Sequence, residues 1–281
     1  MIHFYRSHIK RYTFLLIPGI LSANTALSDT VFSNTDFLET EKFSLKSEIL
    51  KETRNMIIHL PEGYDNTNKN RYSVIYMLDA GNDDTLTATI ASQLHTAGIM
   101  PKVIVVAIKN IRRGYDFARP YDMSGRGDER RKGNGENFSE FIKRELIPAI
   151  NKNFKTNDKK IFMGHSAGGA FASYLLSQSP DLFDGFLIFS PAPGDSSDRL
   201  FKDFRENINR DINLPEFIYA SVGGDEATQF KRSYQRLTSS LKKHTPSKVK
   251  LKFETTDGAD HMENPERSIS SALKFAWKTM H

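Results

Sequence analysis

Hydrophobic residues along this chain form short blocks of strand length, separated by stretches in which they recur with helical period. Two near-continuous blocks, at residues 72–78 and 103–108, consist mainly of β-branched, aromatic and other apolar side chains. Such blocks are typical of strands that are buried on both faces of a parallel sheet. Shorter blocks predict further strands at residues 56–60, 160–163, 186–189, 217–222 and 249–253.

Helical segments alternate with these strands. Apolar residues recur three or four positions apart from Phe138 to Ile147, which predicts an amphipathic helix that ends near Phe154. Further helices are expected at residues 170–178, 228–243 and 266–280. The alternation predicts the α/β class, with one mostly parallel central sheet, helices on both of its faces and right-handed crossovers. We therefore expect a single domain over residues 46–281, preceded by an extended lead-in at residues 29–45.

The first 28 residues differ from the rest of the chain. They carry Arg6, Lys10 and Arg11 but no acidic residue, and continue into an apolar run and then into small residues. This order predicts a secretory signal peptide at residues 1–28, cleaved after Ala26 or after Ser28. An uncleaved anchor is the alternative, although the apolar run is shorter than the roughly 20 residues that span a bilayer. We expect a periplasmic or secreted protein without stable membrane insertion once the signal is removed.

The composition narrows the classes of function. The chain has 281 residues, of which 38% are hydrophobic and 26% charged, a balance typical of folded globular proteins. It contains no cysteine, which excludes thiolate metal sites, disulfides and a cysteine nucleophile. The 39 Lys and Arg residues against 34 Asp and Glu give a net charge of +5. Without the first 28 residues the count is 36 against 34, or +2, so we expect no nucleic-acid partner.

The candidate chemistry begins at residues 164–168, which read Gly-His-Ser-Ala-Gly. A Gly-x-Ser-x-Gly sequence between a strand and a helix allows a strained turn that exposes the serine at the edge of the sheet. The turn also places Ser166 at a helix N-terminus, where free N–H groups favour developing negative charge. Because an apolar strand precedes the sequence and a helical pattern follows it, we identify Ser166 as a candidate nucleophile.

A serine nucleophile needs a general base, and in this type of sheet the chain order is serine, acid, histidine. His261 lies between the last predicted strand and the last predicted helix. Such a loop, at the carboxyl end of a strand, is where an open α/β sheet carries its reactive groups. We therefore predict His261 as the base and a supporting role for His165. The other histidines fall in the leader, in predicted strands or helices, or at the chain end: His3, His8, His59, His95, His244 and His281.

The acid that orients the histidine should follow the strand at residues 217–222, where Asp225 and Glu226 stand side by side. Its role is to bind the second imidazole nitrogen and stabilise the imidazolium. Spacing leaves both residues as candidates. Asp257 and Asp260 are closer to the histidine in sequence, but each is better explained as a turn residue of its own loop.

Two backbone N–H groups are needed to bind the oxyanion of the tetrahedral intermediate. The first is expected from Ala167, the residue after the nucleophile. The second should come from the loop after the strand at residues 72–78, where Gly81 is the first choice and Ala80 and Asn82 are the alternatives.

Beyond these residues, the chain resembles the putative esterase family of α/β-hydrolases, which includes esterase D-like enzymes and enterochelin esterases. Residues 60–64 (Leu-Pro-Glu-Gly-Tyr) are similar to a family motif, as are the strand that ends at Asp79 and the segment from Met100 to Asn110. The Glu-Leu-Ile-Pro helix at residues 145–148 and the pair Ser190-Pro191 are similar as well. The resemblance extends over residues 45–280.

This resemblance implies the α/β-hydrolase fold and a triad of Ser166, Glu226 and His261, with Glu226 favoured over Asp225. It also marks Arg113, in an Arg-x-x-Asp loop, as a candidate substrate-binding residue. Two departures stand out. Asp79-Ala80-Gly81 replaces the usual Asp-Gly, and the aromatic pair that often follows Ser-Pro is absent. The family's substrate is therefore not transferred to this chain.

We predict a serine hydrolase that cleaves small carboxylic esters through an acyl-enzyme, without a metal or an organic cofactor. Its substrate is a siderophore ester or another small acyl ester in this prediction. An acyltransferase with the same triad is the first alternative. A ligand-binding protein on a hydrolase scaffold, without catalysis, is the second.

Overall fold

The computed structural model describes residues 39–67, 69–118, 133–193, 197–208 and 213–280. The predicted signal peptide at residues 1–28 lies outside the described residues, as does most of the predicted lead-in at residues 29–45. The described residues belong to one compact unit that begins at Leu38.

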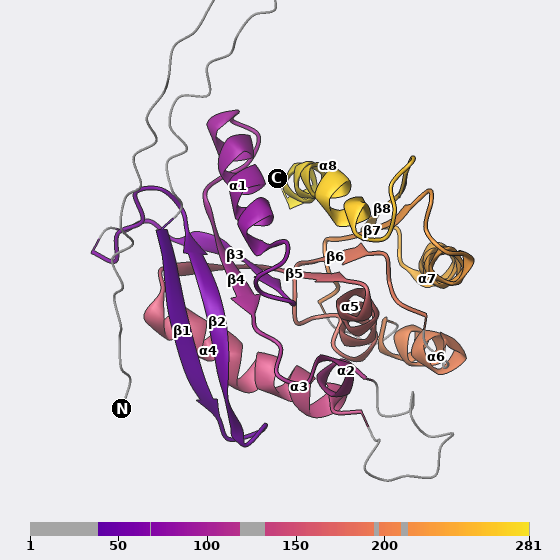
Figure 1. Cartoon of the computed structure of the whole chain (residues 1–281), viewed down its shortest axis with the longest axis horizontal. Coiled ribbons are helices and arrows are strands. Elements are labelled where there is room, and N and C mark those ends of the chain that lie inside the picture. The colour runs from indigo at the N-terminus through magenta and orange to yellow at the C-terminus, as the bar shows by residue number, and fades with distance from the viewer. Residues whose placement is uncertain (1–38, 68, 119–132, 194–196, 209–212, 281) are drawn as a thin grey trace, which may run out of the picture. The chain divides into compact units, whose positions relative to one another are not determined.

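An eight-stranded sheet forms the centre of this unit, in the order β1-β2-β4-β3-β5-β6-β7-β8 (Figure 1). The first two strands are antiparallel to their neighbours, and the six from β3 to β8 are parallel. The strands are β1 (Glu39–Ser47), β2 (Glu52–Leu60), β3 (Tyr72–Met77), β4 (Val103–Ile108), β5 (Thr156–His165), β6 (Gly185–Phe189), β7 (Phe217–Gly223) and β8 (Lys250–Thr256).

Helices cover both faces of the sheet, as the sequence predicts (Figure 1). One face packs against α1 and α8, and the other against the remaining long helices. Every residue of β3, β4, β6 and β7 is buried, which explains their near-continuous apolar sequences. The helices are α1 (Asp84–Thr96), α2 (Arg113–Asp116), α3 (Gly135–Phe141), η3 (Ile142–Leu146), α4 (Ile147–Asn153), α5 (Ala167–Gln178), α6 (Ser197–Ile208), α7 (Thr228–His244) and α8 (Glu263–Met280).

The structure describes the end of the predicted lead-in as a strand. Residues 39–45, expected within an extended lead-in, are part of β1, which pairs with β2 along its whole length. The strand is mostly polar because it lies at the edge of the sheet, where Phe43 is its only hydrophobic side chain that is fully buried. The helix predicted to end near Phe154 is continuous from α3 through α4 but contains one π-helical turn, η3.

One ionic cluster is enclosed in the packed interior. The side chains of Arg54 on β2 and Asp116 on α2 are both fully buried, and their charged atoms lie 2.9 Å apart. Glu52 pairs with the same guanidinium, which also lies 5.2 Å from the ring centroid of Phe138. This cluster ties the antiparallel edge of the sheet to the short helix α2.

Among the residues that the structure describes, no helix has both the length and the apolar character that crossing a bilayer requires.

Candidate active site

The nucleophile turn predicted from the sequence is present between β5 and α5. Ser166 has φ +58° and ψ −120°, a left-handed conformation that a side chain adopts only under constraint. Its neighbours must be small, because a Cβ at Gly164 would collide with the carbonyl of Gly168, and one at Gly169 would lie 2.7 Å from the carbonyl oxygen of Phe189. The glycines therefore allow the turn that exposes the hydroxyl at the carboxyl edge of the sheet.

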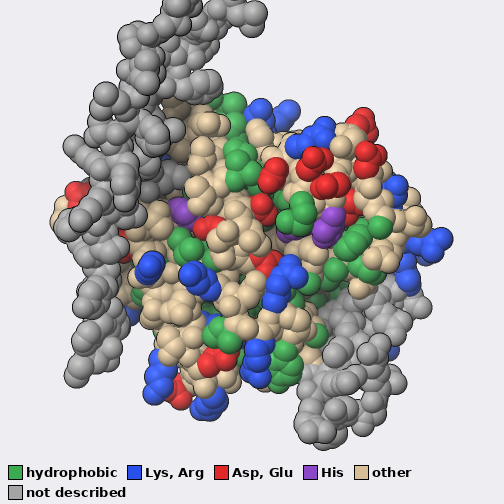
Figure 2. Space-filling view, viewed as in Figure 1, with side chains coloured by type: hydrophobic (Ala, Val, Ile, Leu, Met, Phe, Trp, Pro, Cys, Tyr) green, Lys and Arg blue, Asp and Glu red, His purple; other side chains and the backbone are tan. Residues whose placement is uncertain are grey.

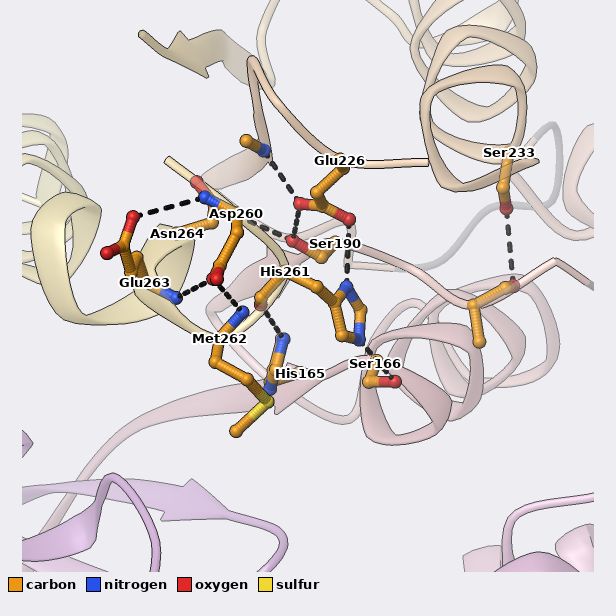
Figure 3. A network of polar contacts seen from close by, with 12 residues as sticks. His165, Ser166, Ser190, Glu226, Ser233, Asp260, His261, Met262, Glu263 and Asn264 are labelled. Atoms are coloured by element: carbon orange, nitrogen blue, oxygen red, sulfur yellow. Dashed lines mark hydrogen bonds and ion pairs between the residues drawn. The ribbon is translucent and has the colours of Figure 1, made fainter. Parts of the chain in front are cut away.

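Three side chains from separate loops meet at this turn (Figure 3). The hydroxyl oxygen of Ser166 lies 2.9 Å from Nε2 of His261, and Nδ1 of the same imidazole lies 2.8 Å from Oε2 of Glu226. Ser166 follows β5, Glu226 follows β7 and His261 follows β8. Parallel strands end at the same edge of the sheet, so residues that are distant in sequence converge there.

The structure also separates the two candidate acids. Glu226 is buried and contacts the imidazole, whereas Asp225 is exposed and its N–H donates to the carbonyl of Ala259. Burial raises the pKa of Glu226. Hydrogen bonds from His261, the Ser190 hydroxyl and the Gly223 N–H lower it by more than burial raises it, so the pKa lies below its ordinary value. Glu226 therefore stays ionised beside the imidazole.

His165, expected in a supporting role, contacts the backbone of the loop that carries His261. Its Nε2 lies 2.9 Å from the carbonyl oxygen of His261, and the two ring centroids are 4.7 Å apart. Burial, with the charge of His261, lowers the pKa of His165 to about 4. His165 is therefore a neutral hydrogen-bond donor near pH 7 that binds the backbone of the His261 loop. Phe230 also contacts His261, and the centroids of these two rings are 4.1 Å apart.

The two aspartates of the His261 loop are not its orienting acids. Asp260 accepts hydrogen bonds from the N–H groups of Met262 and Glu263 at the start of α8, and these bonds lower its pKa. It therefore caps the helix, as an aspartate at this position commonly does. Asp257 accepts a hydrogen bond from Arg267 through its backbone carbonyl.

The two expected oxyanion donors differ in their surroundings. Ala167 is the first residue of α5, so its N–H has no acceptor within the helix. The N–H of Gly81, in contrast, donates to the carboxylate of Asp84 at 2.6 Å. The alternatives are engaged as well, since the N–H of Ala80 donates to Ile108 and that of Asn82 to Asp79. In this conformation the loop after β3 presents none of the three N–H groups as a free donor, and its part in oxyanion binding stays a prediction.

Arg113, the candidate substrate-binding residue, forms an ion pair within the protein, with Asp79. Its Nε and one terminal nitrogen contact the two carboxylate oxygens of Asp79, at 2.5 and 2.9 Å, and Asn110 donates to the same carboxylate. Asp79 has φ +62°, and its carboxylate would touch a Cβ placed on Gly168. The pair therefore holds the loop after β3 against the nucleophile turn, while Arg113 keeps 38% of its side chain exposed.

The surface around the site is mixed in character. Figure 2 shows histidine side chains at the surface of this face, next to hydrophobic and acidic side chains. Met262, directly after His261, is 60% exposed, and Ile111, in the loop after β4, is 49% exposed. Both side chains lie in loops that follow parallel strands, β8 for Met262 and β4 for Ile111.

Comparison with known proteins identifies relatives of this chain in structure and in sequence. A crystal structure of the BES protein from Bacillus cereus superposes with a TM-score of 0.73 at 24% identity, covering 90% of this chain and 99% of that one. An IroE-like serine hydrolase from Shewanella oneidensis superposes with a TM-score of 0.72 at 24% identity, covering 85% of this chain and 80% of that one. In sequence, the chain is 26% identical over 233 residues to the ferri-bacillibactin esterase BesA of Bacillus subtilis. This alignment covers 73% of this chain and 78% of that protein.

The fold is therefore the α/β-hydrolase fold of esterases, as the sequence predicts. The chain belongs to the Putative esterase family, whose profile matches residues 47–272. It is a carboxylic ester hydrolase, which confirms the class of enzyme expected from the nucleophile turn.

Proposed function

We propose that this protein is a serine esterase in which Ser166, His261 and Glu226 act as a catalytic triad. The observation that carries the proposal is the unbroken line of contacts, 2.9 Å from serine to histidine and 2.8 Å from histidine to glutamate. Distances of this size allow proton transfer without rearrangement of the protein. The buried, ionised glutamate fixes the imidazole tautomer that has a free Nε2 facing the serine.

The reaction then takes two steps. Nε2 of His261 accepts the hydroxyl proton while Oγ of Ser166 forms a bond to the acyl carbon of the ester. The protonated imidazole returns this proton to the alcohol oxygen as the ester C–O bond breaks, which leaves the acyl group on Ser166. In the second step His261 takes a proton from water, the hydroxide attacks the acyl carbon, and the carboxylic acid leaves with the serine hydroxyl restored.

The N–H of Ala167 binds the oxyanion formed in both steps. Its position at the N-terminus of α5 adds the favourable potential of the helix dipole. Gly81 is our candidate for the second donor, and this role requires the substrate to compete with Asp84 for its N–H. Arg113, whose side chain is 38% exposed, remains our candidate for a contact with substrate.

For the substrate we propose an ester of an iron-binding siderophore. Support comes from the sequence relative, which is a ferri-bacillibactin esterase. A siderophore hydrolase of Aspergillus nidulans shares the fold, with a TM-score of 0.69 at 20% identity. The predicted signal peptide at residues 1–28 is consistent with action in the periplasm or outside the cell.

Hydrolysis assays test this function. We expect the protein to hydrolyse p-nitrophenyl acetate and ferri-bacillibactin, and Ser166→Ala to lower kcat for both by several orders of magnitude. Ser44→Ala, which removes an exposed hydroxyl on the edge strand β1, is the control and should leave both rates unchanged. Undiminished hydrolysis by Ser166→Ala would contradict the mechanism. Activity on p-nitrophenyl acetate without activity on ferri-bacillibactin would contradict the substrate alone.

A further inference from the structure

A chain of buried polar side chains reaches Glu226 at Oε1, the carboxylate oxygen that does not contact the imidazole (Figure 3). Ser190 follows β6, Thr256 ends β8 and Asn264 lies in the first turn of α8. Ser190 and Asn264 are completely buried, and Thr256 is 9% exposed. Polar groups in such a position are costly to bury unless each finds a partner, and here each does.

The direction of the hydrogen bonds in this chain follows from the chemistry of its members. An ionised carboxylate only accepts, so the Ser190 hydroxyl donates its single proton to Oε1 of Glu226. The same hydroxyl oxygen accepts from Nδ2 of Asn264 at 2.8 Å. Oδ1 of that amide accepts from the Thr256 hydroxyl at 2.6 Å, which fixes the orientation of the amide. The chain therefore runs in one direction, from Thr256 through Asn264 and Ser190 to Glu226.

The backbone of Ser190 is held in an uncommon conformation that serves this contact. Its φ is +43°, in the left-handed region, although it is not a glycine. Its N–H donates to the carbonyl of Ser221 on β7 at 2.8 Å, and Pro191 follows it directly. Strain of this kind persists where the surrounding structure enforces it and is frequent at active sites.

We propose that Ser190 and Asn264 are positioning residues that hold the carboxylate of Glu226 in the orientation its contact with His261 requires. The proposal rests on the triad proposed above. Oε1 of Glu226 is held by the Ser190 hydroxyl and by the Gly223 N–H at 2.7 Å, which leaves Oε2 for the imidazole. With one oxygen fixed in this way, the carboxylate has no freedom to rotate away from His261.

The hydrogen bonds from Ser190 and Gly223 also affect how the negative charge of Glu226 acts on the imidazole of His261. Each hydrogen bond to Glu226 disperses its negative charge, and removal of the Ser190 donor concentrates that charge toward His261. A more concentrated charge favours the imidazolium, which is inactive as a base. The other titratable groups that act on this pair are His165 on β5 and Asp260 in the His261 loop, and Asp79 acts on His165. The hydrogen bonds of the Ser190 side chain go to Glu226 and Asn264 and to none of these groups.

The first test is Ser190→Ala, assayed with p-nitrophenyl acetate across pH. We expect kcat to fall about tenfold at little cost in KM, because the substrate does not touch this residue. We also expect the acidic limb of kcat/KM to move upward by about half a pH unit. Ser177→Ala is the matched control, since it removes another buried serine hydroxyl, on α5, that donates to the carbonyl of Tyr174. It should leave the pH profile unchanged.

A double-mutant comparison separates positioning from general support of the fold. In a Glu226→Gln background the proposed role of Ser190 is already lost, so adding Ser190→Ala should change kcat less than twofold, about the limit of detection. An equal loss in both backgrounds would overturn the proposal. So would an unmoved pH profile in the single variant.

Asn264→Asp provides a second variant if Ser190→Ala does not fold. The new carboxylate competes with Glu226 for the Ser190 proton while the shape of the side chain is kept, so we expect a loss of kcat at least as large as with Ser190→Ala. Wild-type activity and pH profile in a folded Asn264→Asp would overturn the proposal. Full activity of Ser166→Ala would instead contradict the proposed triad, so the two failures are distinguishable.

Discussion

At the scale of single residues, the site depends on which groups are charged. His165 lies under the His261 loop, where burial keeps its imidazole neutral and its pKa near 4. In the unfolded chain the same side chain takes up a proton near pH 6.5. Because the unfolded state binds this proton first, His165 stabilises the fold fully only above that pH, and the contribution is lost as the pH falls toward 4.

His165→Asn tests this linkage. The amide can still donate to the carbonyl of His261 but does not titrate, so we expect the free energy of unfolding to depend less on pH between about 6.5 and 4 than in the wild type. Denaturant unfolding at a series of pH values measures the slope. Parallel curves for the two proteins in this interval would show that His165 titrates normally in the folded state.

The adjacent acids Asp225 and Glu226 give the sharpest contrast at this scale. Glu226→Gln removes the charge that stabilises the imidazolium, and we expect kcat/KM to fall by about two to four orders of magnitude. Asp225→Asn changes an exposed side chain without contact to His261 and should lower the rate less than twofold. Steady-state kinetics on p-nitrophenyl acetate compare the two, and a larger loss with Asp225→Asn would reverse the assignment.

The sequence indicated Ser166, His261 and an acid after β7 as neighbours because such residues lie in recognisable local patterns. It did not indicate the groups that hold them in place. Spacing could not choose between Asp225 and Glu226, since neighbouring residues point in different directions and only the fold decides which one is buried. The engagement of the Gly81 N–H by Asp84 depends on loop geometry that carries no sequence pattern. The Ser190-Pro191 pair does not indicate the hydrogen bond from Ser190 to Glu226, because this bond joins segments that are distant in the chain.

At the scale of secondary structure elements, α2 forms two ion pairs, one with the loop after β3 and one with the strand β2. Arg113 binds Asp79 next to the nucleophile turn, and Asp116 binds Arg54 in the packed interior. Without Asp116, the buried guanidinium of Arg54 keeps only Glu52, whose side chain is 21% exposed, and loses its fully buried partner. Loss of a buried partner costs more than loss of an exposed pair.

Asp116→Ala is therefore expected to lower the free energy of unfolding by roughly 3 kcal/mol, the lower end of the range for a broken buried pair, because Glu52 still contacts Arg54. The control is Glu140→Ala, which breaks a surface pair with Arg144 on the neighbouring helical segment and should change stability only slightly. Urea unfolding of both variants measures the difference. Similar stability of the two would mean that the Arg54 guanidinium reaches solvent in Asp116→Ala.

Elements were predictable from the sequence where burial is complete and less so where it is one-sided. β3, β4 and β7 were visible as apolar blocks because both of their faces are covered. β1 was not visible as a strand, since its pairing depends on backbone hydrogen bonds at a solvated edge. The helix α6 has a helical pattern in its sequence, since Leu200, Phe204 and Ile208 recur every four residues and are all buried.

At the scale of the whole molecule, parallel strands bring three loops to one edge of the sheet, and the class of enzyme follows from this topology and from the family. The predicted signal peptide at residues 1–28 implies export to the periplasm or out of the cell. When the full chain is produced in a bacterium with a periplasm, we expect the mature protein to begin at Leu27 or Asp29. N-terminal sequencing of the periplasmic fraction measures this, and recovery of the intact N-terminus in the membrane fraction would favour the uncleaved anchor.

The central claim is that the acyl group passes through Ser166, and trapping of the covalent enzyme tests it most directly. The protein is incubated with a reactive phosphonate ester, digested and analysed by mass spectrometry, with His261→Ala treated in parallel. We predict one stoichiometric modification, on Ser166, together with complete loss of esterase activity, and greatly slowed labelling of His261→Ala. Full inactivation with Ser166 unmodified, or unimpaired ester hydrolysis by the protein labelled at Ser166, would contradict the account.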